Sequence, residues 1–221
     1  MADISEIKEL SHTLNLMNVY NGSIDLTDEK ISNLDYLYNI LKQEVDIRRG
    51  NKKKAIQKGS HIPINKVFDD AGITQGMRWQ LHKIEELDYS KTNEKIMIVG
   101  DVATGKTSLA TKIAKDAINK QNLVVYVTEE DLLLEYRKQK TMWNKLLKAD
   151  LIILDELFYL TPTDENLKLL YKIIMFLSEA RSFVFVTNRP LSEWDKMAVD
   201  KHIISTFRQR IMTDAQLIHL G

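Results

Sequence analysis

The stretch that decides the fold is Lys95-Ile-Met-Ile-Val-Gly-Asp-Val-Ala-Thr-Gly-Lys-Thr-Ser-Leu109. Its four uncharged apolar residues, Ile96 to Val99, are typical of a strand that is buried on both faces. Gly100 and Gly105 bracket a turn, and the residues that follow begin a helix. The order of strand, G-x-x-x-x-G-K-T and helix predicts a P-loop within an α/β fold.

The predicted P-loop has the residues that a phosphate site needs. Glycines let backbone N–H groups converge on one point, and the helix N-terminus adds partial positive charge there. Lys106 can reach the β- and γ-phosphates, and the Thr107 hydroxyl can bind Mg²⁺. The predicted nucleotide-binding residues are Gly100, Asp101, Val102, Ala103, Thr104, Gly105, Lys106, Thr107 and Ser108. The alternative interpretation is a plain strand–turn–helix connection that happens to contain two glycines.

The composition bounds the class of protein. The 221 residues, 44% of them hydrophobic, accommodate one large domain or one domain with a small appendage. Lys+Arg and Asp+Glu are equal at 31 each, so any contact with nucleic acid requires a local basic patch. The absence of cysteine rules out disulfides and fits a cytoplasmic protein. The charged N-terminus and the lack of a long apolar run lead us to expect no secretory signal and no membrane partner.

Residues 1–60 are expected to form a small helical domain. Helical spacing of apolar residues predicts a first helix over about residues 3–18, with the stripe Ile4, Ile7, Leu10, Leu14 and Met17. Thr27 is expected to cap a second helix, with the stripe Ile31, Leu34, Tyr38, Leu41 and Val45. Both stripes are expected to form the core of a helical bundle.

A basic run occupies residues 48–58, which contain no acidic residue. Its members are Arg48, Arg49, Lys52, Lys53, Lys54 and Lys58. One interpretation is a solvated helix end or linker, and the other is a contact with the phosphates of DNA. The following residues, around Pro63, predict an extended connector into a second domain at residues 61–221.

Strands and helices alternate from about Gly72 onward. After the P-loop helix, strands are predicted near residues 123–128, 151–155, 183–188 and 216–220, with a last helix near 199–212. This alternation predicts a parallel sheet with helices on both faces.

Two further strand ends carry candidate catalytic residues. The apolar strand Leu151–Leu154 ends in Asp155 and Glu156, where α/β proteins bind ligands. Asp155 would hold Mg²⁺, and Glu156 would deprotonate the water that attacks the γ-phosphate, which favours hydrolysis. The amide of Asn188, after the fourth strand, could hold that water if the strand order is 5-1-4-3-2. The alternatives are an acidic turn after a strand and a turn asparagine before Pro190.

These three motifs resemble the AAA+ ATPases of the DnaC/IstB type, which are bacterial helicase loaders and transposition helpers. The resemblance covers most of the chain and includes residues 100–110 (GDVATGKTSLA), 149–160 (ADLIILDELFYL) and 187–194 (TNRPLSEW). It implies an AAA+ core with a five-stranded parallel sheet of order 5-1-4-3-2, no helical lid, binding of ATP with Mg²⁺, and oligomerisation on DNA. The chain departs from the family at Asp101-Val102, at Ser108, and at Phe158, where a glycine is usual.

The resemblance also implies an arginine that completes the nucleotide site of a neighbouring subunit. Arg208 and Arg210 lie on the predicted last helix, and the family pattern favours Arg210 over Arg208. Arg189 is a weaker third candidate, and a surface salt bridge is the alternative for each.

A second candidate DNA surface surrounds Trp143 in the region after the second strand. Its basic residues are Arg137, Lys138, Lys140, Lys145 and Lys148. In the resembled family this region faces the filament axis, and an aromatic among basic residues suits stacking on bases. The alternative is a core tryptophan beside solvated lysines.

We expect an ATP hydrolase that oligomerises on DNA and assists a transposase in DNA transposition. The near alternative is a loader that places a replicative helicase during DNA replication. Two other classes stay open. A P-loop kinase would need an acceptor pocket and a lid, and an adaptor would bind ATP without hydrolysing it.

Overall fold

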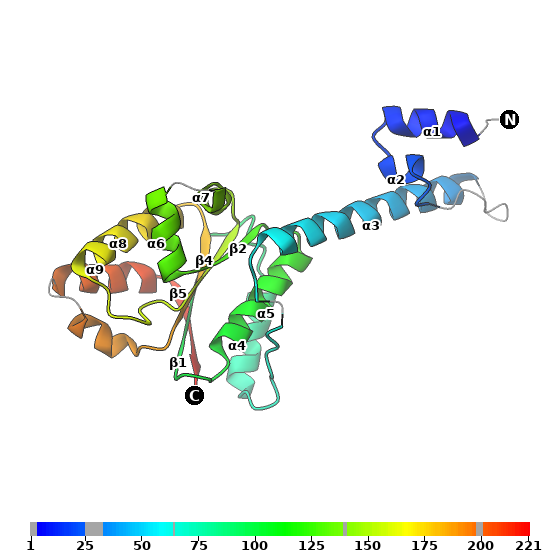
Figure 1. The fold of residues 1–221 in the computed structure, drawn as a ribbon. Helices are drawn as coiled ribbons and strands as arrows, with labels where there is room; N and C mark the ends of the chain where they lie inside the picture. The colour runs from blue at the N-terminus through cyan, green and yellow to red at the C-terminus, as the bar shows by residue number, and fades with distance from the viewer. Residues whose placement is uncertain (1–3, 25–32, 64, 139–140, 198–200) are drawn as a thin grey trace. The chain divides into compact units, whose positions relative to one another are not determined.

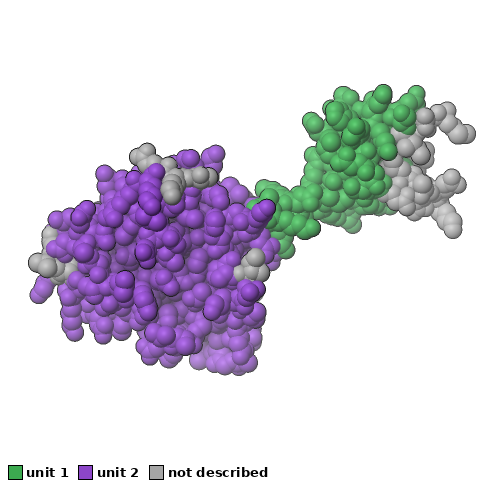
Figure 2. Space-filling view, in the orientation of Figure 1, with its two compact units in different colours: residues 1–55 green, residues 56–221 purple. Residues whose placement is uncertain are grey.

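The computed structural model describes residues 4–24, 33–63, 65–138, 141–197 and 201–221. The chain forms two compact units, residues 1–55 and residues 56–221 (Figure 2). The boundary between the units lies inside helix α3 (Asn33–Gly59).

Unit 1 contains α1 (Ile4–Thr13), α2 (Met17–Tyr20) and most of α3. The single helix predicted over residues 3–18 is wrong, because the chain turns at Asn15, which has a left-handed φ of 56°. The expected cap Thr27 and the stripe residue Ile31 lie outside the described residues. The structure also contradicts the predicted bundle core, because many of the stripe side chains are exposed. They are Leu10, Leu14, Met17, Tyr38, Leu41 and Val45.

A buried carboxylate contributes to the packing of unit 1. Glu44 is only 3% exposed, accepts a hydrogen bond from the Asn18 backbone N–H (3.2 Å) and pairs with Arg48 (2.7 Å). The basic run that begins at Arg48 lies in the C-terminal half of the continuous helix α3, which agrees with its interpretation as a solvated helix end. The basic side chains of the run are solvated on the surface of that helix.

The core of unit 2 is a five-stranded parallel sheet. Its strands are β1 (Lys95–Gly100), β2 (Val124–Thr128), β3 (Leu151–Asp155), β4 (Ser182–Thr187) and β5 (Ala215–Leu220). Their order is β2-β3-β4-β1-β5, which confirms the predicted order read from the other edge. Strands β1 to β4 are buried almost throughout, whereas the edge strand β5 is partly exposed. The near-continuous apolar sequences of the first four follow from burial on both faces.

Two layers of helices cover the sheet (Figure 1). On one face lie α4 (Gln75–Glu86) and α5 (Lys106–Asn119), which pack with Ile96 and Ile98. On the other face lie α6 (Glu129–Lys138), α8 (Asp164–Ser178) and α9 (Lys201–Met212). The short helices α7 (Thr141–Leu146) and η1 (Leu191–Lys196) complete this layer. Among the described helices of unit 2, the sequence interpretation omitted α4 and the short η1.

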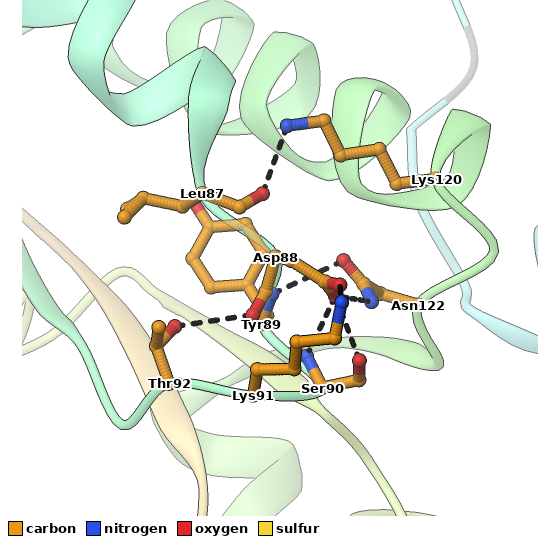
Figure 3. Close-up of polar contacts among 8 residues, drawn as sticks. All are labelled: Leu87, Asp88, Tyr89, Ser90, Lys91, Thr92, Lys120 and Asn122. Carbon is orange, nitrogen blue, oxygen red and sulfur yellow. Dashed lines mark hydrogen bonds and ion pairs between the residues drawn. The ribbon is translucent and has the colours of Figure 1, made fainter.

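A network of hydrogen bonds fixes the C-terminal end of the P-loop helix to the segment that leads into β1 (Figure 3). The Asp88 carboxylate accepts from Asn122 Nδ2 (2.9 Å) and from Ser90 Oγ (2.7 Å). Lys120 donates to the Leu87 carbonyl (2.9 Å) from the residue that ends α5. The bond from Asn122, with help from Ser90 and Lys91, holds the pKa of Asp88 well below its ordinary value. The C-terminal end of the helix that begins at the P-loop is therefore tied to the segment before β1.

Candidate nucleotide-binding site

The P-loop connects β1 to α5 and contains two glycines that are needed for different reasons. A Cβ on Gly100 would lie 1.9 Å from the Leu220 carbonyl oxygen, so β5 can pass beside β1 only if that residue is glycine. Gly105 has a φ of 92°, a conformation that L side chains rarely adopt, and α5 begins at the next residue. The loop therefore has the backbone that a phosphate-binding turn requires.

Lys106 is buried in the first turn of α5. Its ammonium group donates to the carbonyl of Asp101 across the loop, and Thr104 Oγ1 donates to the same oxygen (2.9 Å). Burial lowers the pKa of Lys106, and the charges of Asp155 and Asp101 oppose this lowering. The lysine thus lies inside the loop, at the position from which a P-loop lysine reaches the β- and γ-phosphates.

The Asp155 carboxylate at the end of β3 is held by three donors. Its Oδ2 accepts from Thr107 Oγ1 (3.0 Å) and from the Tyr126 hydroxyl, and its Oδ1 accepts from the Glu156 N–H (2.7 Å). Burial and the charge of Asp155 raise the pKa of Tyr126, so this phenol remains a donor at neutral pH. The Thr107 hydroxyl and the carboxylate are hard oxygen ligands side by side, a donor set that suits Mg²⁺.

One open pocket brings the three motifs together. Its lining residues are Val102, Ala103, Lys106, Thr107, Asp155, Glu156, Tyr159, Val186, Thr187 and Asn188. The strand order explains this, because β4 lies between β1 and β3 and so Asn188 emerges between the P-loop and Glu156. The Glu156 side chain is exposed to the pocket and solvent, as a base that must meet water requires.

Two residues that the sequence interpretation did not connect with Glu156 contact the turn that carries it. Glu129, at the start of α6, accepts the Phe158 N–H (2.7 Å). Arg189, after β4, donates from Nε to the Phe158 carbonyl (2.5 Å). Burial raises the pKa of Glu129 to about 7, against the effect of the Phe158 N–H, which lowers it.

The two predicted finger arginines lie on α9, outside the pocket that Glu156 lines. Arg208 pairs with Asp195 (2.7 Å) and donates to the Leu191 carbonyl (3.2 Å), so η1 holds its guanidinium. Arg210 is exposed, and its side chain has no hydrogen bond or ion pair with the residues that the structure describes.

The predicted DNA surface around Trp143 is partly engaged within unit 2. Trp143 is half-buried against Tyr136, with ring centroids 5.0 Å apart. Arg137 donates to Asn166 Oδ1 (2.7 Å), and Lys145 donates to the Gly59 carbonyl (3.2 Å). Lys138 and Lys148 are exposed, and Lys140 lies outside the described residues.

No cluster of three or more potential metal-binding His, Cys, Asp or Glu side chains occurs in the described part of the chain. In the same residues, no helix has the length and hydropathy that crossing a bilayer requires.

Two proteins that are named for insertion sequences are similar to this chain over most of its length. A protein from Bacillus thuringiensis subsp. berliner, named as an ATP-binding protein of insertion sequence IS232, is 26% identical over 212 residues, which cover 89% of this chain and 84% of that protein. A protein of the same description from Geobacillus stearothermophilus, of insertion sequence IS5376, is 24% identical and covers 86% of this chain and 79% of its own.

Solved structures share the fold at low sequence identity. The DnaC helicase loader superposes with a TM-score of 0.56 at 16% identity, over 70% of this chain and 94% of that chain. AMPPCP-bound DnaA from Aquifex aeolicus gives a TM-score of 0.53 at 18% identity, over 73% of this chain and 52% of that chain. The family model for IstB-like ATP binding proteins matches residues 6–221, nearly the whole sequence. The chain is therefore an ATP-binding P-loop protein of AAA+-like fold and belongs to the IstB-like ATP-binding protein family.

Proposed function

We propose that this protein hydrolyses ATP, assembles on DNA in its ATP-bound form and assists a transposase. The observation that carries the enzymatic part is the convergence of Lys106, Thr107, Asp155, Glu156 and Asn188 on one pocket. The transposase part follows from relatives that are named for insertion sequences and that match this chain over most of its length.

Each side chain of the pocket has a separate role in the proposed hydrolysis of ATP. Thr107 and Asp155 would hold Mg²⁺, which when bound neutralises charge on the β- and γ-phosphates. Lys106 adds a second positive charge at the same oxygens. Glu156 takes a proton from water as the water oxygen bonds to the γ-phosphorus and the bond to the ADP oxygen breaks. The products are ADP and inorganic phosphate, and the Asn188 amide orients the attacking water.

A neighbouring subunit would supply the remaining positive charge. Arg210 is exposed on α9 and its side chain has no partner among the described residues, whereas Arg208 is held by Asp195. An arginine donated in trans accelerates phosphoryl transfer by ~10³–10⁵ in well-studied cases. We therefore assign Arg210 the trans role and expect turnover to rise when DNA gathers subunits.

The exposed basic run on α3 is the first candidate for the DNA contact. Six cations lie within residues 48–58, and phosphate contacts by such a run release counterions. The exposed Lys138 and Lys148 form the second candidate. Replacing Lys52, Lys53 and Lys54 together should flatten the dependence of log affinity on log salt, by about one unit or less for each phosphate that the variant no longer neutralises. An unaltered slope would contradict the assignment of this run.

A mixing experiment tests the mechanism. Lys106→Ala subunits should fail to bind nucleotide but still offer Arg210, whereas Arg210→Ala subunits should bind ATP but offer no arginine. Mixed on DNA, the two inactive proteins should recover part of the phosphate release. No recovery in mixtures that co-assemble on DNA would contradict a trans arginine.

Electron microscopy with an ATP analogue and DNA tests the assembly. We expect oligomers with nucleotide at subunit interfaces, and dispersed subunits would contradict the proposal. The fold shared with the DnaC loader supports a second candidate, the loading of a replicative helicase. A preference for single-stranded over duplex DNA would favour that candidate. Phosphate transfer to a small molecule would indicate a kinase, and ATP binding without hydrolysis would indicate an adaptor.

A further inference from the structure

The turn that carries Glu156 has an unfavourable backbone. Glu156 and Phe158 both have a φ of 59°, in the left-handed region that glycine adopts readily and other residues rarely. Neither is glycine, so surrounding contacts must hold the turn in place. The direction in which Glu156 points therefore depends on those contacts.

Packing fixes one side of this turn. The Leu157 N–H donates to the Val186 carbonyl on β4 (2.9 Å). The Phe158 ring is fully buried and meets Trp194 edge-on, with ring centroids 4.7 Å apart. These contacts anchor the side chains of the turn in the core, but they leave the polar groups of the Phe158 backbone to be satisfied.

Ionisable side chains from two other elements bind both backbone groups of Phe158. The Glu129 carboxylate accepts its N–H (2.7 Å), and the Arg189 guanidinium donates to its carbonyl (2.5 Å). The same guanidinium reaches Thr161 Oγ1 (3.2 Å), farther along the loop. Hydrogen bonds to charged groups are stronger and more directional than neutral ones. Glu129 and Arg189 thus bind the N–H and the carbonyl of one residue in a strained turn, and we call this arrangement the Phe158 clamp.

The clamp uses one acidic and one basic side chain, Glu129 and Arg189. Within the described residues, neither Glu129 nor Arg189 forms an ion pair at 4.0 Å or less. A partly buried carboxylate without a cation is unfavourable, and the raised pKa of Glu129 reflects this cost. The described contacts of the two side chains are with the turn that follows Glu156.

We propose that Glu129 and Arg189 are positioning residues, which hold the Phe158 backbone and thereby aim the Glu156 carboxylate at the attacking water. The inference rests on the proposed function, in which Glu156 is the base. It also assigns Arg189 a role within its own subunit, in place of the trans role for which the sequence made it a weaker candidate.

The test compares ATP-analogue affinity and ATP turnover in Glu129→Leu and Arg189→Met, with Glu129→Gln and Arg189→Lys as conservative variants. Misplacing a catalytic group by about 1 Å costs on the order of 10²-fold in rate, so we expect kcat to fall by that order in the first pair. The conservative pair should retain more of kcat, because an amide oxygen still accepts and an ammonium still donates. Analogue affinity should stay within about twofold in all four, since none of these residues touches the phosphates in the proposed site.

Matched controls separate positioning from general destabilisation. Glu130 is the exposed neighbour of Glu129, so Glu130→Leu makes the same chemical change without touching the turn. Arg181 also donates to a backbone carbonyl, that of Leu147 (2.6 Å), away from the pocket. Arg181→Met should therefore lower stability while leaving kcat unchanged.

The outcomes distinguish failure of the Phe158 clamp from failure of the proposed function. Wild-type kcat in Glu129→Leu and Arg189→Met would overturn the clamp, provided that Glu156→Gln is inactive. If Glu156→Gln turns over ATP like the wild type, the proposed function fails instead. If the apolar variants do not fold, a smaller but measurable loss of kcat at normal affinity in Arg189→Lys, which cannot reproduce the guanidinium bonds to both Phe158 and Thr161, supports the clamp, and unchanged kcat in that variant overturns it. Rescue of Arg189→Met by Lys106→Ala subunits would place Arg189 in trans and also overturn it.

Discussion

Replacing Glu129 with glutamine should stabilise unit 2 much more at pH 8 than at pH 5. Burial raises the pKa of Glu129 from its ordinary value of 4.5 to about 7 in the folded protein. An acid with a raised folded pKa binds protons more tightly when folded, so its ionisation lowers the free energy of unfolding as pH rises from about 4.5 to 7. Each pKa unit corresponds to 1.36 kcal/mol, so ionised Glu129 should cost about 3 kcal/mol. Glutamine cannot ionise and avoids this cost.

Urea unfolding followed by tryptophan fluorescence measures this effect directly. The chain has three tryptophans, Trp79, Trp143 and Trp194, and all lie in residues 56–221, so their signal reports unit 2. The difference between variant and wild type should grow by about 2–3 kcal/mol from pH 5 to pH 8. Other titrating groups are common to both proteins and largely cancel. Glu130→Gln, at an exposed position, should show no such growth. A pH-independent difference for Glu129→Gln would refute the reasoning.

Three further predictions follow from other contacts. Gly100→Ala should lower the melting temperature, because its Cβ would lie 1.9 Å from a backbone oxygen of β5. Overpacking of this kind costs about 1–3 kcal/mol or more, so an unchanged melting temperature would contradict the close approach of the two strands. Asp88→Asn should destabilise the protein at pH 7, because a carboxyl whose pKa is lowered on folding stabilises the fold while it is ionised. The loss of stability relative to the wild type should shrink as pH falls below 3.8, the ordinary pKa of aspartate. Thermal unfolding at pH 3 and pH 7 measures this loss, and an equal loss at both pH values would contradict the prediction. Tyr126→Phe removes a donor to Asp155, so the Mg²⁺ concentration for half-maximal ATP-analogue binding should rise about 10-fold or more, while binding without Mg²⁺ stays unchanged.

Periodicity predicted the parallel sheet of unit 2, whereas its strand order followed from the resemblance to the AAA+ ATPases of the DnaC/IstB type. The apolar runs that precede Gly100 and Asp155 are long, uncharged and bounded by polar residues, so their burial follows from composition. Helix α4 was also predictable, because Met77, Leu81 and Ile84 recur at helical spacing after the capping residue Thr74.

The contacts around Glu156 could not be predicted from a single sequence. Glu129, Glu130 and Asp131 read as three equivalent acids in the first turn of a helix, and only the packing shows that Glu129 is turned toward Phe158. The bond from Tyr126 to Asp155 depends on the register of β2 against β3 and on which face the phenol takes. Such contacts arise from side-chain direction across elements, which local patterns do not encode.

In unit 1 the sequence pattern predicted burial that the structure does not show. Leu10 and Leu14 in the first stripe and Leu41 in the second have helical spacing, so they were expected to be buried, yet these side chains are exposed in the structure. Helical periodicity identifies an amphipathic face but does not specify what covers it.

The most direct test of the central claim is phosphate release by the wild type and by Glu156→Gln, measured on samples whose ATP-analogue binding has been confirmed. The account predicts that both proteins bind nucleotide with similar affinity and that only the wild type releases phosphate, because the amide cannot accept the proton of the attacking water. The bound variant should also persist on DNA in the presence of ATP. Phosphate release at the wild-type rate by Glu156→Gln would contradict the account and leave the end of β3 with a structural role only.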